Sequence, residues 1–75
     1  MAKVTFEIKE RIGVITEKRD GWSFEVNIVS WNGGEAKVDL RDWNEDHTLM
    51  SRPHNLTKDE AKKLVELLTN YFKEA

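Results

Sequence analysis

The chain has 75 residues, no cysteine and a formal net charge of −2, which is the size of one small domain. The lack of cysteine excludes disulfide bonds, thiolate metal sites and a cysteine nucleophile, and it favours a reducing, cytoplasmic setting. No run of about 20 apolar residues predicts a membrane span, and no apolar segment near the first residue predicts a secretory signal. The acidic charge excludes binding of nucleic acid by bulk electrostatics, so that any such site has to be a local patch.

The first strand is expected over about residues 4–18, where apolar and polar residues alternate. The even-numbered residues of this segment are expected on one face of a sheet, and they are Val4, Phe6, Ile8, Ile12, Val14 and Thr16. Glu10 and Gly13 interrupt the alternation and predict a bend or bulge. Three further strands are expected, over residues 22–31, 36–43 and 49–56. The last of these has to be an edge strand, because Pro53 cannot donate a ladder hydrogen bond.

The turns fix the register of the hairpins. If the even-numbered apolar residues of the second and third strands share a face, a three-residue loop, 32–34, has to join the strands, and paired residue numbers sum to about 66. This register places Val29 opposite Lys37, Asn27 opposite Asp39 and Glu25 opposite Arg41. The same reasoning gives the loop 19–21 for the first hairpin. Both loops end in Gly, the residue that best tolerates a left-handed closing position.

A C-terminal helix is expected over about residues 58–73. Thr57 followed by Glu60 is a capping box. An apolar stripe follows at spacings of three and four, and its members are Ala61, Leu64, Val65, Leu68, Tyr71 and Phe72. Leu67 lies beside this stripe, where it either flanks the core or contacts a second copy of the chain. A partner subunit offers a chain this short additional stability.

The odd-numbered face of the sheet carries the strongest functional signal. The register places Trp31 and Trp43 there together with Lys37 and Arg41, opposite the apolar even face. Exposed tryptophan rings offer a stacking surface for unpaired bases, and the cations can contact phosphates. The alternative is that the helix, a dimer partner or a chain terminus covers both tryptophans. Parity places Trp22 on the even face, at the edge of the core.

No catalytic, metal or cofactor site is predicted. His47 and His54 lack the spacing of a zinc motif. Ser23, Ser30 and Ser51 lack the context of an activated nucleophile.

Three segments carry a resemblance to a known family: Val29-Ser30-Trp31-Asn32-Gly33, Lys37-Val38-Asp39-Leu40-Arg41-Asp42-Trp43, and Leu56-Thr57 before the helix. They resemble the positive cofactor four family of transcriptional coactivators, and in particular its small bacterial YdbC-like branch. The resemblance implies an α+β fold, with a curved four-stranded antiparallel sheet followed by one C-terminal helix, assembled as a homodimer. It also implies binding of single-stranded DNA with little sequence preference, in transcription, replication or repair.

The resemblance assigns the interface aromatics to Trp31 and Trp43, and their polar neighbours to Asn32, Lys37 and Arg41. Together with the remaining cations and polar residues, the expected nucleic-acid interface comprises Lys18, Arg19, Trp22, Asn27, Trp31, Asn32, Lys37, Arg41, Trp43 and Arg52. The chain departs from the family in the approach to the helix, where residues 51–55 carry one fixed cation in place of a lysine- and glycine-rich segment. The serine- and lysine-rich extension of eukaryotic members is absent. A protein-interaction module that uses the tryptophan face, or a protein that binds single-stranded RNA, remains an alternative.

Overall fold

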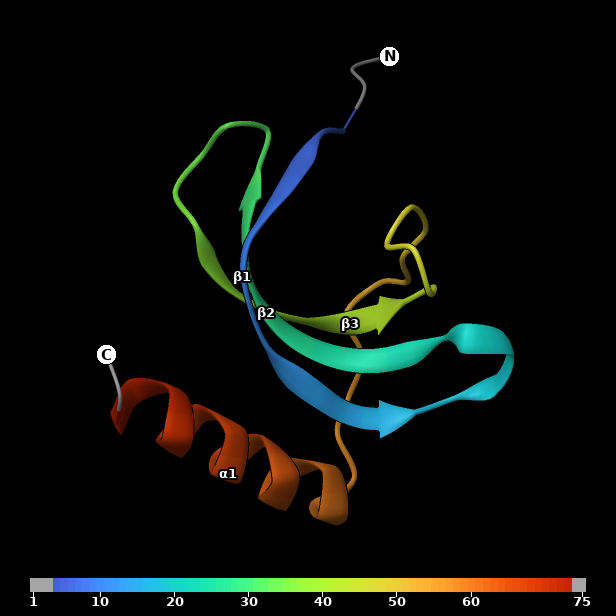
Figure 1. Cartoon of the computed structure of the whole chain (residues 1–75), viewed down its shortest axis with the longest axis vertical. Helices are drawn as coiled ribbons and strands as arrows, with labels where there is room; N and C mark the ends of the chain where they lie inside the picture. The colour runs from blue at the N-terminus through green and yellow to red at the C-terminus, as the bar shows by residue number, and fades with distance from the viewer. Residues whose placement is uncertain (1–3, 74–75) are drawn as a thin grey trace.

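The computed structural model describes residues 4–73 and shows a three-stranded antiparallel sheet followed by one helix. The strands are β1 (Phe6–Glu17), β2 (Ser23–Trp31) and β3 (Lys37–Trp43), in the order β1-β2-β3, and the helix is α1 (Lys58–Lys73). The sheet curves strongly, and α1 lies on its convex side (Figure 1). The predicted α+β class is therefore confirmed, with a C-terminal helix after the sheet.

The register between β2 and β3 is confirmed. Val29 pairs with Lys37, Asn27 with Asp39 and Glu25 with Arg41. The turn that sets this register differs from the prediction. The left-handed residues are Asn32, with φ 52°, and Gly33, with φ 74°, rather than the closing Gly34.

The predicted loop of the first hairpin, residues 19–21, is confirmed. Arg19–Gly21 form one turn of 3₁₀ helix, Gly21 has a φ of 80°, and Glu17 pairs with Ser23 directly beyond it. A left-handed φ favours glycine, so the turn residue and the backbone agree.

Away from this turn, β1 does not keep the predicted alternation. The pairing with β2 shifts at three places, between Ile8 and Glu10, between Arg11 and Gly13, and between Val14 and Thr16. A bulge near Glu10–Gly13 was predicted, and the other two shifts were not. Each bulge sets two residues of one strand against one of its partner, which reverses the faces of the residues beyond it.

Three even-numbered residues of β1 therefore lie on the face opposite to the one predicted for them. Phe6 pairs with Trp31, and Val14 pairs with Glu25, on the concave face of the sheet. Ile8 lies with them, because it pairs with Val29. The expectation that the even set of β1 shares one face is wrong, and the concave face receives apolar side chains that were assigned to the helix side.

The core lies between the convex face of the sheet and α1. Its buried members are Ile15, Phe24 and Val26, against which pack Ile12, Leu40, Leu56, Leu64, Leu67 and Leu68. Leu67 is a core residue, because its Cδ2 lies 2.7 Å from the position that a Cβ on Gly13 would take. Glycine at position 13 therefore allows the helix to approach β1 closely.

The start of α1 is as predicted. The backbone amide of Glu60 donates to the Thr57 hydroxyl at 3.1 Å, and the Glu60 carboxylate accepts the Thr57 amide at 2.9 Å, which is a capping box. The predicted apolar stripe is only partly buried, since Val65 is 64% and Phe72 59% exposed. The curved sheet reaches one side of the helix and leaves these two side chains uncovered.

The prediction of a fourth strand over residues 49–56 is wrong. Within residues 49–56 there is a single isolated bridge, from Met50 to Trp43, and the chain then runs without regular structure to α1. Pro53 has no amide hydrogen to continue a ladder. No helix in the described part of the chain is long and apolar enough to span a bilayer.

Candidate functional site

The concave face of the sheet holds a second packed layer. Trp43 and Val29 have no exposed surface. The Trp43 ring lies 5.1 Å from the Phe6 ring and 5.5 Å from the His47 ring, measured between centroids. The expectation that Trp43 offers an open stacking surface is therefore wrong for the single chain. The bulges in β1 bring Phe6 onto its ring, and the loop after β3 covers it with His47.

Arg41 is held by neighbouring groups rather than extended into solvent. Its Nε donates to the two carboxylate oxygens of Asp39 at 3.0 and 2.8 Å, and its Nη1 donates to the Ser51 carbonyl at 3.3 Å. Its guanidinium carbon lies 4.4 Å from the centroid of the Trp31 ring, a cation–π contact. The ion pair of Arg41 is thus with Asp39, two residues away on the same strand, rather than with Glu25, which lies opposite it on β2. Arg41 therefore positions the Trp31 ring, which is half-buried.

Asn27 is buried in a polar network. The Glu25 carboxylate accepts hydrogen bonds from the Asn27 amide at 3.1 Å, from the Ser23 hydroxyl, and from His47 Nε2 at 2.8 Å. Burial raises the pKa of Glu25, but these hydrogen bonds outweigh it and hold the pKa below its ordinary value. Because Asn27 is 1% exposed, it supports the floor of the concave face and does not reach a ligand.

Asn32 joins the end of β2 to the residue that precedes β1. Its Oδ1 accepts the Thr5 amide at 2.9 Å, and its backbone amide donates to the Thr5 carbonyl at 2.8 Å. The side chain that was expected to contact a base is thus engaged, through its oxygen, in the fold.

Two half-exposed tryptophans mark the opposite ends of β2. Trp31 ends the strand, and the exposed Lys37 lies diagonally across from it on the same face. Trp22 precedes the strand, next to the turn that carries the exposed Lys18 and Arg19. The nine residues of β2 span roughly 30 Å when extended.

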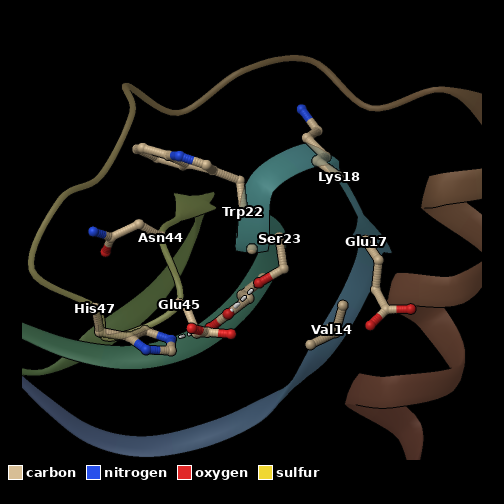
Figure 2. A pocket seen from close by; sticks show the side chains of 10 residues that line it. Val14, Glu17, Lys18, Trp22, Ser23, Asn44, Glu45 and His47 are labelled. Atoms are coloured by element: carbon tan, nitrogen blue, oxygen red, sulfur yellow. Dashed lines mark hydrogen bonds and ion pairs between the residues drawn. The ribbon is translucent and has the colours of Figure 1, made fainter.

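Trp22 borders a cavity at the hairpin end of the concave face. The cavity has a volume of about 270 Å³, and Figure 2 shows the Trp22 indole ring at one side of it, next to Asn44. Its lining residues come from the end of β1, the first turn, the start of β2 and the loop after β3, and they are Val14, Glu17, Lys18, Gly21, Trp22, Ser23, Glu25, Asn44, Glu45 and His47. The expectation that Trp22 lies at the core edge of the even face is wrong, because Trp22 sits before the strand begins, where strand parity does not apply.

The segment before α1 is fixed to β3 by His54. Its Nε2 contacts Asp42 Oδ1 at 2.9 Å, its Nδ1 contacts the Asn55 carbonyl at 2.9 Å, and its ring lies 4.1 Å from the Phe24 ring. Asp42 also accepts Lys18 Nζ at 2.9 Å. The exposed Arg52 lies in the same segment, so that this anchored segment carries one of the expected interface cations.

The predicted interface includes two tryptophans that are half-exposed in the structure, Trp22 and Trp31, and four exposed cations, Lys18, Arg19, Lys37 and Arg52. It also includes four residues that are buried or engaged in the fold, Asn27, Asn32, Arg41 and Trp43. Sequence reasoning missed the roles of His47 and His54, for which no short motif gives a signal. Their partners, Glu25 and Asp42, lie more than ten residues away in the chain.

No protein-family model matches the chain. An uncharacterized protein of Treponema pallidum (strain Nichols) is 34% identical over 65 residues, which cover 87% of this chain and 76% of that protein. The matched part includes most of the sheet and helix, because only ten residues of the chain fall outside it. The chain therefore belongs to the same protein family as this Treponema protein.

Proposed function

We propose that the chain binds single-stranded DNA along the concave side of its sheet, by stacking bases on Trp22 and Trp31 and by contacting phosphates with the exposed cations beside them. The observation that carries this proposal is the placement of the two half-exposed tryptophans at the two ends of β2, each next to exposed lysine or arginine. Stacking on an aromatic ring tolerates any base, so this interface has little overall sequence preference.

The charges favour a single strand over a duplex. The chain has a net charge of −2, so it exerts little long-range attraction on a duplex backbone. Lys18, Arg19, Lys37 and Arg52 are exposed and occupy the ends of the strands and the segment before α1. Local cations beside stacking rings suit a flexible strand that bends from one ring to the other.

We also propose that the chain functions as a homodimer of non-catalytic, cofactor-free subunits in the cytoplasm, in transcription, replication or repair. The support for the dimer is the exposed apolar surface of α1, where Val65 is 64% and Phe72 is 59% exposed. These residues are seven apart and lie on one stripe of the helix. A second copy would cover this stripe and leave the concave face free for DNA.

The test is a titration of a labelled oligo-dT strand and of a duplex of the same length with the wild-type chain and with the variant Trp31→Ala. We expect the single strand to bind more tightly than the duplex. Losing one stacked base should weaken binding of the single strand by about 5- to 150-fold. Unchanged thermal unfolding of Trp31→Ala is the control for its fold. Equal affinity of the wild-type chain for the two forms at physiological salt contradicts the proposal.

A further inference from the structure

The cavity beside Trp22 is lined by one aromatic ring and several carboxylates. We propose that it receives one unpaired nucleobase with an exocyclic amino group, namely cytosine, adenine or guanine, in preference to thymine or uracil. This inference rests on the proposed function and gives the otherwise tolerant interface a preference at one position.

The size and walls of the cavity suit one base. Its volume of about 270 Å³ lies just below the range of about 300–1,000 Å³ of pockets that hold drug-sized ligands. The Trp22 ring lines one side of the cavity (Figure 2), and Val14, which is 42% exposed, supplies an apolar wall. A flat heterocycle can therefore stack on the indole ring with its edge directed toward the polar lining.

The polar lining consists mainly of hydrogen-bond acceptors. The Ser23 hydroxyl already donates to Glu25, so its oxygen presents lone pairs. Asn44 is engaged at both ends of its amide, because its nitrogen donates to the Thr48 hydroxyl at 3.0 Å and its Oδ1 accepts the Thr48 and Leu49 backbone amides at 2.9 Å. The carboxylates of Glu17 and Glu45 also line the cavity, and both residues are exposed. Such a lining has to be matched by donors on the ligand.

The bases differ in the hydrogen-bonding groups that they present to such a lining. Cytosine and adenine carry an amino group that donates, and carboxylates are suitable acceptors for the cytosine amino group. Thymine and uracil present a carbonyl oxygen at the corresponding position. A carboxylate facing that oxygen repels it and leaves it unpaired, which is the basis of the preference.

The charges also orient the nucleotide. Glu17, Glu25 and Glu45 line the cavity. The Lys18 ammonium is bound to Asp42 at 2.9 Å, so that the exposed Arg19 in the adjoining turn is the cation at this end of the sheet. Carboxylates repel a phosphate, and a cation attracts it. A strand therefore enters with its base inward and its backbone toward Arg19.

The test compares oligo-dC with oligo-dU of the same length, because these bases differ in the group at C4, an amino group in one and a carbonyl oxygen in the other, and neither carries the thymine methyl group. We expect the wild-type chain to bind oligo-dC about 5- to 30-fold more tightly than oligo-dU, the discrimination of one modest base contact. Glu45→Gln should narrow this ratio, since the new amide can donate to the uracil oxygen. Trp22→Ala should weaken binding of both strands and narrow the ratio.

Glu66→Gln is the matched control, because Glu66 is an exposed carboxylate on α1, outside the cavity. It should leave the ratio unchanged. Tight and equal binding of the two strands by the wild-type chain overturns this inference and leaves the proposed function standing. The inference is also overturned if Glu45→Gln binds both strands more tightly but keeps the wild-type ratio of oligo-dC to oligo-dU affinity. In that case the Glu45 carboxylate only repels the strand through its charge and does not recognise the base. If neither strand binds, both proposals fail.

Discussion

The guanidinium of Arg41 lies over the Trp31 ring at 4.4 Å, while its Nε is bound to both carboxylate oxygens of Asp39. Side-chain exposure of the pair is low, at 15% for Arg41 and 7% for Asp39. An arginine held in this way fixes the plane of the aromatic ring and has little freedom to follow a phosphate. Arg41 therefore differs from the exposed Lys37, which has no such contact among the described residues and can approach a phosphate.

Arg41→Gln and Lys37→Gln should therefore differ in their effects. Lys37 is exposed, and its replacement should reduce the slope of log affinity against log salt by about one unit with little effect on stability. Arg41→Gln should lower the stability by about 1–3 kcal/mol, because Asp39 is left buried without its partner, and should leave the salt slope unchanged. Binding titrations at several salt concentrations and urea unfolding of both variants measure these effects. A reduced salt slope for Arg41→Gln with unchanged stability would show that Arg41 contacts a phosphate.

Trp43 should behave as a core residue. Trp43→Ala removes a ring with no exposed surface and should lower the free energy of unfolding by about 3–5 kcal/mol. Trp43→Phe should cost less, because the phenyl ring keeps part of the packing and the Trp43 Nε1 has no hydrogen-bond partner among the described residues. Urea unfolding of the two variants gives the comparison. A folded Trp43→Ala variant with wild-type stability and weakened DNA binding would restore Trp43 to the interface.

The sequence predicts the parts of the fold that depend on local chemistry. The capping box at Thr57 and the Gly21 turn are read from neighbouring residues, and the β2–β3 register follows from alternation on two unbroken strands. The bulges of β1 could not be placed in this way. Apolar residues occupy even positions on both sides of Glu10, while the pairing with β2 shifts three times. Bulge positions depend on the partner strand and on the approach of Leu67 to Gly13.

The error in the site follows from the error in β1. Because the bulges carry Phe6 to the concave face, Trp43 gains an aromatic neighbour that parity had assigned to the helix side. The loop after β3 then places His47 on Glu25, a contact between residues 22 positions apart. Neither contact has a sequence signature, whereas the accessibility of Trp31 and Lys37 follows from their positions on β2 and β3.

The stability of the chain should fall at mildly alkaline pH because of His54. Its hydrogen bond to Asp42, together with that to the Asn55 carbonyl, raises the pKa of His54 above the ordinary value of 6.5. A pKa raised by folding contributes stability that is fully present below 6.5 and is lost as the pH rises through the value in the folded chain. We expect the free energy of unfolding to decrease as the pH rises above 6.5 in the wild-type chain, and much less in His54→Gln.

The stability of the chain at acidic pH depends on groups other than His54. Hydrogen bonds from Ser23 and His47 outweigh burial and lower the pKa of Glu25, so its contribution is present above the ordinary value of 4.5 and is lost as the pH falls below it. His54→Gln should therefore leave the contribution of Glu25 to the acid limb intact. It should reduce the contribution of Asp42, because burial raises the pKa of Asp42 and the hydrogen bonds from His54 and Lys18 lower it. Identical alkaline limbs in the wild-type chain and in His54→Gln would contradict the role of His54.

The exposed stripe of α1 should mediate self-association. Val65→Glu places a charge on a side chain that is 64% exposed in the single chain, so it should leave the fold intact and disrupt a dimer. Sedimentation equilibrium should give about twice 8.8 kDa for the wild-type chain and 8.8 kDa for the variant. Asn70→Glu, at an exposed position off the stripe, is the control and should stay dimeric. A wild-type chain of 8.8 kDa at all concentrations would contradict the proposed dimer.

The most direct test of the interface uses the three tryptophans of the chain as reporters. Each indole Nε1–H gives a separate signal in a ¹H–¹⁵N NMR spectrum, and the signals can be assigned with single Trp→Phe variants. On addition of an oligo-dT strand, the signals of Trp22 and Trp31 should shift while that of the buried Trp43 stays close to its original position. A spectrum in which Trp43 alone shifts, or in which no indole signal moves at a saturating strand concentration, would contradict binding of the strand at the two ends of β2.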